Sequence, residues 1–139
     1  MAFDEVADRI LHMVGDVAAS SGSVVARREG SFGDVPAETA TALSLATTEL
    51  CQNAIEHSLD SSSGNVIVRP HRTDDALVVD IVSDGKPLPA GFSLDDHRSS
   101  LGLSIVTTLV QDLDGTFTLE NNSDRVGTCA RLVIPLQRM

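Results

Sequence analysis

The sequence predicts an α/β two-layer sandwich, in which a mixed sheet of about five strands packs against three helices. Three segments repeat apolar residues at helical spacing, and five shorter runs are strand-like. Most of the strand-like runs follow one another in neighbouring pairs, which indicates hairpins. This order differs from the strict strand–helix alternation of a doubly wound sheet and predicts helices gathered on one face.

The three helices are expected over residues 3–19, 36–58 and 101–113. The first has acidic residues near its start, where the helix dipole favours them. The second begins at Pro36, a residue suited to the first helical turn, and meets no breaker until about Ser58.

The expected strands cover residues 24–28, 66–68, 76–82, 116–120 and 128–136. Thr73–Asp75 lies between the second and third of these runs and predicts a hairpin turn. Residues 84–100 show no periodicity and contain several Gly and Pro, so we expect a long loop there.

Composition limits the classes of function. The 139 residues fit one domain, and 42% hydrophobic with 22% charged residues is typical of a globular protein. A net charge of −10 with scattered basic residues argues against nucleic-acid binding. No apolar run is long enough for a membrane span, and Cys51 and Cys129 lack metal-site spacing, so we expect free thiols in a cytoplasmic protein.

The second expected helix carries the sharpest chemical signal. Glu49 and Asn53 are four residues apart and share one helical face, with Gln52, Glu56 and His57 beside them. A carboxylate and an amide that emerge from a mostly apolar helix suit a divalent cation that also binds phosphate oxygens. The alternative is an ordinary solvated stripe on an amphipathic helix.

Three weaker signals follow along the chain. Asp84-Gly85 ends a buried strand and can approach a flat ligand, although an ordinary strand-ending turn explains this segment better when it is taken alone. Ser100-Leu101-Gly102-Leu103 opens a helix whose free N–H groups can hold phosphate, or whose Ser is only a cap. Gly127-Thr128 opens the last strand and is weak alone.

Taken together, the four segments resemble, in order and spacing, the N, G1, G2 and G3 boxes of the GHKL ATPase superfamily, over roughly residues 36–136. The helix Glu49-x-x-x-Asn53-Ala54-x-x-His57 is similar to the N box of histidine kinases. The resemblance implies the Bergerat α/β sandwich, with ATP and Mg²⁺ as cofactors.

The resemblance also implies a role for each matched residue. Asn53 would bind Mg²⁺, and Glu49 would be the catalytic acidic residue that polarises the attacking group. Gly102 would lie at the triphosphate, Thr128 near adenine, and Lys86 or Arg98 of a lid loop at phosphate. The implied nucleotide site comprises Asn53, His57, Asp84, Gly85, Lys86, Arg98, Ser100, Leu101, Gly102, Leu103 and Thr128.

The G1 segment departs from the family pattern Asp-x-Gly-x-Gly. The alignment puts Ser83 at the position of the Asp that reads adenine, Pro87 at the second Gly, and Asp84 one residue away. Either a local shift brings Asp84 to the base or that contact is lost, because a one-residue slip reverses side-chain direction in a strand. Ser100 also replaces a Gly of the G2 box.

The function implied is that of the ATP-binding catalytic domain of a sensor histidine kinase. It would transfer the ATP γ-phosphate to a histidine on a separate dimerisation domain, for relay to a response regulator. We expect residues 1–139 to be one domain of a longer kinase, without an acceptor histidine of its own and so without autophosphorylation. The alternatives are an anti-sigma-factor serine kinase of the same superfamily and a binding module that has lost its nucleotide.

Overall fold

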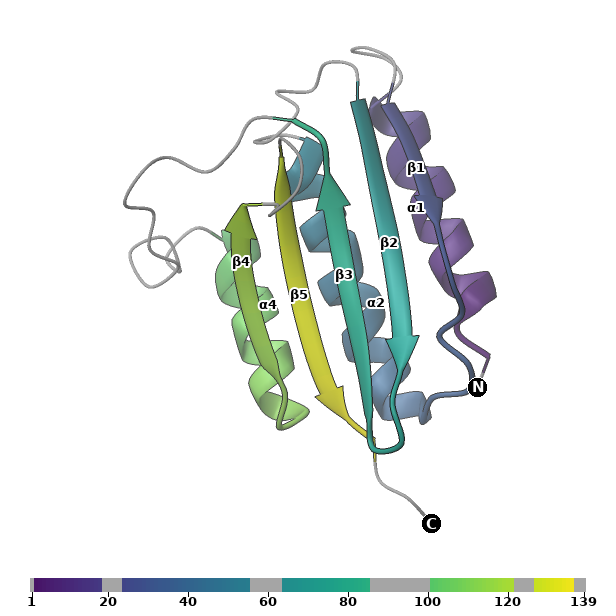
Figure 1. The fold of residues 1–139 in the computed structure, drawn as a ribbon, viewed down its shortest axis with the longest axis vertical. Helices are drawn as coiled ribbons and strands as arrows, with labels where there is room; N and C mark the ends of the chain where they lie inside the picture. The colour runs from purple at the N-terminus through teal and green to yellow at the C-terminus, as the bar shows by residue number, and fades with distance from the viewer. Residues whose placement is uncertain (1, 19–23, 56–63, 86–100, 122–126, 137–139) are drawn as a thin grey trace.

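The structure is a computed structural model and describes residues 2–18, 24–55, 64–85, 101–121 and 127–136 (Figure 1). Its elements are α1 (Asp4–Ala18), β1 (Val24–Arg28), α2 (Ala37–Asn53), β2 (Gly64–Arg72), β3 (Ala76–Ser83), α4 (Leu101–Asp112), β4 (Thr116–Asn121) and β5 (Thr128–Pro135). Every helix and strand predicted from the sequence is present. None of the helices within these ranges is long and apolar enough to cross a membrane.

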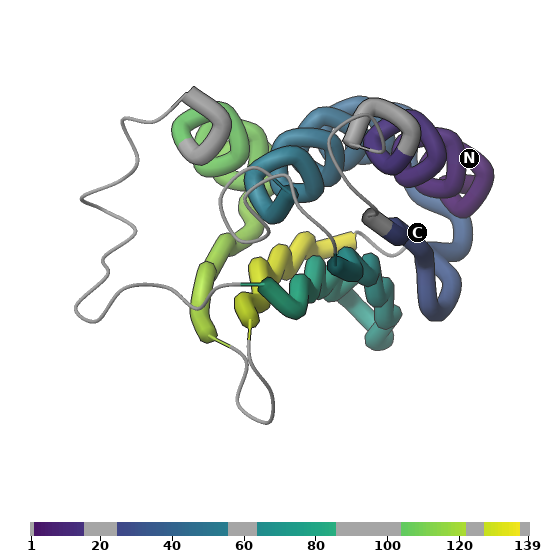
Figure 2. Tube along the Cα trace, turned by 90° about the horizontal axis from the view of Figure 1, so that it is seen from above, coloured from purple at the N-terminus to yellow at the C-terminus, as the bar shows by residue number. Residues whose placement is uncertain are grey.

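One five-stranded sheet forms a layer of its own. The strands lie in the order β1-β2-β3-β5-β4, with β1 and β2 parallel and the other neighbours antiparallel. Figure 2 shows α1, α2 and α4 side by side over one face of this sheet. The predicted two-layer sandwich with a mixed sheet is therefore confirmed.

Strand β2 is longer than predicted and contains a proline. The sequence indicated a strand over 66–68, whereas β2 runs through Pro70 to Arg72. The Val68 carbonyl accepts a hydrogen bond from the Glu29 N–H on the β1 side. Pro70 lies two residues later, so its backbone nitrogen, which carries no hydrogen, faces the same side of β2. Because β1 has ended there, no hydrogen bond of the sheet is lost.

The core lies between the two layers and is mainly aliphatic, as the shortage of aromatic residues predicts. The alternation of β3 and β5 directs one set of their side chains toward the helices. These inward residues are Leu77, Val79, Ile81, Ala130, Leu132 and Ile134. The exception to the aliphatic pattern is the pair Phe3 and Phe32, both fully buried, whose rings meet edge to face at 4.8 Å.

Asp4 ties the start of α1 to the segment that follows β1. Its carboxylate accepts the Phe32 N–H at 2.7 Å and the Ser31 hydroxyl at 2.7 Å, with Arg28 at 3.6 Å. Burial alone would raise the pKa of Asp4, but these hydrogen bonds and the Arg28 charge outweigh it and hold that pKa below its ordinary value.

We expect Asp4→Asn to lower the melting temperature at neutral pH. We also expect the melting temperature of this variant to fall less than that of the wild type as the pH is lowered. A carboxylate with a depressed folded-state pKa stabilises the fold above the unfolded-state pKa of about 3.8, and this contribution is lost as pH falls through the folded value. Melting temperatures from pH 7 to pH 2 test this, with exposed Glu5→Gln of the same helical turn as control. A constant difference between Asp4→Asn and the wild type at all pH values would contradict it.

Thr47 is a polar residue inside the core. It lies on α2, its side chain is fully buried, and its hydroxyl finds no hydrogen-bond partner within the described part of the chain. A buried hydroxyl without a partner costs free energy relative to an apolar group of the same shape.

We therefore expect Thr47→Val to raise the free energy of unfolding by about 1 kcal/mol. The replacement keeps the branched shape and removes only the unsatisfied hydroxyl. The matched control is Thr41→Val on the same helix, where the exposed hydroxyl donates to the Ala37 carbonyl at 3.2 Å. Urea unfolding of the three proteins measures both effects, and a Thr47→Val variant no more stable than the wild type would disprove this.

Candidate functional site

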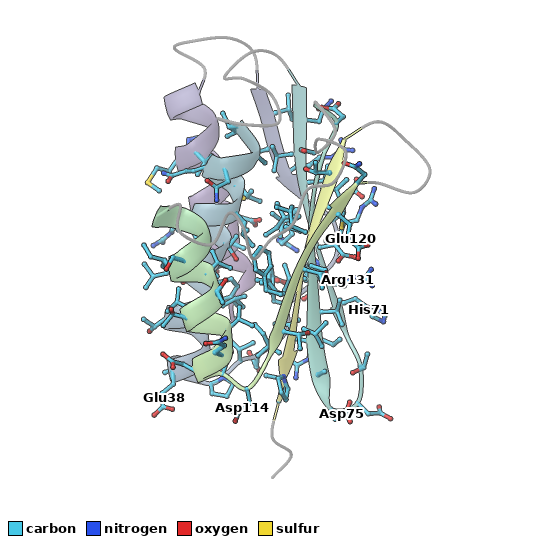
Figure 3. All side chains as sticks on the ribbon, turned by 90° about the vertical axis from the view of Figure 1, so that its left-hand side faces the viewer. Glu38, His71, Asp75, Asp114, Glu120 and Arg131 are labelled. Carbon is cyan, nitrogen blue, oxygen red and sulfur yellow. The ribbon has the colours of Figure 1, made fainter. Side chains whose placement is uncertain are left out.

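The four sequence segments with chemical signals converge at one end of the sandwich. α2 and β3 both end there, β5 and α4 both begin there, and α2 packs against α4 (Figure 1). Glu38, Asp75 and Asp114 mark the opposite end (Figure 3). The candidate site is therefore assembled from elements that are up to 75 residues apart in sequence, counting from Asn53 to Thr128.

Glu49 and Asn53 occupy the last turns of α2 at this end. Both side chains are partly exposed, while Leu50 and Cys51 between them are buried in the core. The Asn53 amide nitrogen is buried and has no hydrogen-bond partner among the residues that the structure describes. An unsatisfied buried amide is costly unless a ligand pairs with it. Rotation of the amide exchanges its oxygen and nitrogen, so Asn53 can offer either a metal ligand or a donor to phosphate.

Ser83 and Thr128 form a buried pair of hydroxyls at the adjoining strand ends. Ser83 is 1% and Thr128 7% exposed, and their side-chain oxygens are 2.9 Å apart. They are register partners in the β3–β5 pairing and continue the inward-facing rows of both strands. Ser83 therefore faces the helix layer, as Thr128 does.

Asp84 faces the other way. Its carboxylate accepts the Asn65 backbone N–H at 2.8 Å and the Asn65 side-chain amide at 2.8 Å. Asn65 precedes the inward-facing Val66 of β2, so it lies on the face of the sheet away from the helices. The sequence had left open whether a local shift brings Asp84 to the base or that contact is lost. Asn65 was missed because its partner is 19 residues away.

Gly127 fixes the approach of β5 to β3. Its φ is +122°, and a Cβ at this position would lie 1.9 Å from the Ser83 carbonyl oxygen. Only glycine fits such a conformation against another backbone. Gly127-Thr128 was a weak signal in the sequence. In the structure, Gly127 allows the close approach of the two strands that brings the hydroxyls of Ser83 and Thr128 together.

The phosphate-binding part of the expected site is described only in part. Leu101, Gly102 and Leu103 form the first turn of α4, as predicted, and Gly85 follows β3. The other expected residues, His57, Lys86, Arg98 and Ser100, lie outside the described residues. The free N–H groups of the first turn of α4 therefore face the end of the sandwich that holds Asn53.

Neither cysteine supplies a reactive thiolate. Both are free, and burial raises the pKa of Cys51 to about 12 and that of Cys129 to about 11. Cys129 lies on the outer face of the sheet, beside Arg131, which binds the Asp80 carboxylate at 2.7 and 2.9 Å. Figure 3 shows Arg131 pointing away from the helices. The expectation of free thiols is confirmed, although Cys129 is only half-buried.

The part of the chain that the structure describes contains no cluster of three or more His, Cys, Asp or Glu that could hold a metal ion. Mg²⁺ does not need such a cluster, because it usually takes one or two protein ligands, several waters and phosphate oxygens. The Asn53 amide, with Glu49 one turn earlier, is consistent with a site of that kind.

Comparison with known proteins agrees with this geometry. Residues 38–138 match the family of histidine kinase-, DNA gyrase B- and HSP90-like ATPases. The sensor histidine kinase PdtaS of Mycobacterium tuberculosis is 43% identical over 97% of this chain, and the chain spans 27% of that protein.

Solved structures show the same fold. The histidine kinase domain of a blue-light-activated kinase from Erythrobacter litoralis superposes with a TM-score of 0.80 at 26% identity, over 98% of this chain and 62% of that one. The mycobacterial sensor histidine kinase MprB has the same fold at 21% identity, with a TM-score of 0.71 over 100% of this chain and 99% of that one. The chain belongs to the family of histidine kinase-, DNA gyrase B- and HSP90-like ATPases, as an ATPase domain of the sensor histidine kinase type.

Proposed function

We propose that this chain binds Mg-ATP at the common end of α2, β3, α4 and β5 and transfers its γ-phosphate to a histidine on a separate dimerisation domain. The observation that supports this most directly is the buried, unpaired amide of Asn53 next to Glu49, at the end where the inward hydroxyls of Ser83 and Thr128 lie. A bound nucleotide with its metal would supply a partner for the Asn53 amide nitrogen at this end of the sandwich.

The proposed roles follow from position. Asn53 binds Mg²⁺ or a phosphate oxygen, and Glu49, one turn earlier on the same face, polarises the incoming histidine. The first turn of α4 with Gly102 supports the triphosphate through backbone N–H groups and the helix dipole. Most of the catalysis in such a site is positioning and charge neutralisation.

The acceptor histidine is proposed to lie outside these 139 residues. His12, the only histidine of α1, is exposed on the first helix, and the apolar Leu11 and Met13 that adjoin it do not resemble an acceptor-histidine box. We therefore propose that the chain is one domain of a longer kinase, with a response regulator as the final acceptor. ATP as substrate and two free thiols are consistent with a cytoplasmic location.

We expect Asn53→Ala to weaken Mg-ATP binding at least about tenfold, or about 1.4 kcal/mol, without loss of thermal stability. The substitution removes an amide nitrogen that has no partner among the described residues, so we expect little loss of folding free energy, while the proposed metal site loses a ligand. Calorimetric titration and a thermal melt measure the two effects separately. The control is Gln52→Ala, an exposed amide of the same helical turn. Equal affinity of Asn53→Ala and the wild type would refute the role of Asn53.

We expect the isolated chain to bind Mg-ATP but to take up no label from γ-labelled ATP. Mixed with a separately produced dimerisation domain that carries an acceptor histidine, it should label that domain with acid-labile phosphate. Glu49→Gln should slow this transfer about a hundredfold or more and leave ATP affinity nearly unchanged. Acid-stable phosphate on serine would instead indicate the serine-kinase alternative, and stable labelling of the isolated chain would contradict the proposal.

A further inference from the structure

The two edge strands of the sheet differ in how they are protected. β1, at one edge, carries Arg27 and Arg28, which form ion pairs with Glu29 and Asp8, and α1 packs against it. Charged side chains on an edge strand oppose pairing with another chain. β4, at the other edge, has the sequence Thr-Phe-Thr-Leu-Glu-Asn, in which there is no proline or basic residue and Glu120 is the one charge. β4 therefore lacks the usual protection of an edge.

The outer edge of β4 is open to a further strand. Among the described strands, β4 is hydrogen-bonded to β5 alone. Figure 2 shows β4 at the end of the sheet, below α4. Phe117 and Leu119 face the helix layer with their register partners on β5 and are only partly buried against the core. A strand placed beside β4 would pair with its backbone and cover these two apolar side chains.

The sequence of β4 is complementary to itself about Thr118. If two copies pair antiparallel with Thr118 opposite Thr118, Phe117 of one lies opposite Leu119 of the other, and Thr116 lies opposite Glu120. Residues directly opposite each other point to the same face, so the apolar pairs fall on the helix side of both sheets. No two like charges meet. A centre at Leu119 would instead set Phe117 against Asn121.

We propose that the outer edge of β4 is a self-association surface, at which two copies of this chain pair about a two-fold axis. The two five-stranded sheets then become one sheet of ten strands, with all the helices on one side. Because the two β4 strands run in opposite directions, the two candidate sites lie at opposite ends of the joined sheet and both stay open. One strand from each copy is a small interface, so the association is weak and depends on concentration.

The first test uses the wild-type chain. Sedimentation equilibrium up to about 1 mM chain should show the mean mass rising from 14.7 kDa toward twice that value. The net charge of −10 on each copy opposes this, and about 0.15 M salt screens the distant charges, since the Debye length is then about 8 Å. Over the same concentrations, the backbone amides of residues 116–121 should gain protection from hydrogen exchange, whereas those of 24–28 in β1 should not.

Charged variants at the centre of the pairing test its register. Thr118→Lys and Thr118→Glu each place two like charges directly opposite each other, so each should weaken self-association at least about tenfold. An equimolar mixture of the two variants places Lys opposite Glu and should associate more tightly than either variant alone. The control is Val25→Lys, which adds the same charge at an exposed position of the other edge strand and should leave association unchanged.

Several results would overturn the inference. A wild-type mass of one chain at every concentration would do so, as would concentration-dependent protection confined to β1. Folded Thr118→Lys and Thr118→Glu variants that associate as the wild type does, or that gain nothing when mixed, would do so as well. A thermal melt shows whether each variant folds, and if one does not, hydrogen exchange in the wild-type chain decides.

Discussion

The antiparallel pairing of β3 with β5 is the constraint on which the rest of the site depends. Its register runs from Ala76 opposite Pro135 to Ser83 opposite Thr128, so it sets which residues of both strands face the helices. Gly127 lets the backbones approach at the last pair, where any side chain would collide with the Ser83 carbonyl. A shift by one residue would turn the whole core-facing set outward, so the hydroxyl pair is fixed by the same forces that fix the core.

The helix layer contributes a different kind of constraint. α2 buries one face from Thr39 to Cys51, and Glu49 and Asn53 lie in its last turns, at the end where β3 stops. Core packing therefore holds Glu49 and Asn53 in place without any hydrogen bond to Asn53's amide nitrogen. A site held rigid by apolar packing can keep a polar group unsatisfied until a ligand arrives, which is the preorganisation that favours binding and catalysis.

The sequence predicted the order and type of every element because periodicity and turn residues are local signals. It also predicted that Glu49 and Asn53 share a face, since helical spacing alone decides this. It could not decide whether Asp84 reaches the base or that contact is lost, because the direction of a strand-end residue depends on register with distant strands. The Asn65 contacts that settle the direction of Asp84 and the long extension of β2 through Pro70 are both products of tertiary pairing.

The acidity of the chain raises the question of how it could attract a triphosphate. Glu38, Asp75 and Asp114 lie at the end opposite the candidate site (Figure 3). α2 alone spans 17 residues between the two ends, or about 25 Å at 1.5 Å per residue. The Debye length at physiological salt is about 8 Å, so charges at the far end are screened from the nucleotide. Among the described residues, the groups that face the site from β3 and β5 are neutral hydroxyls and Asn53 is a neutral amide, whereas Glu49, one turn before Asn53, adds a negative charge. The net charge of −10 is therefore compatible with binding an anion, because what the phosphates would meet is set by the local groups and by the Mg²⁺ proposed to bind with them, and not by the total charge.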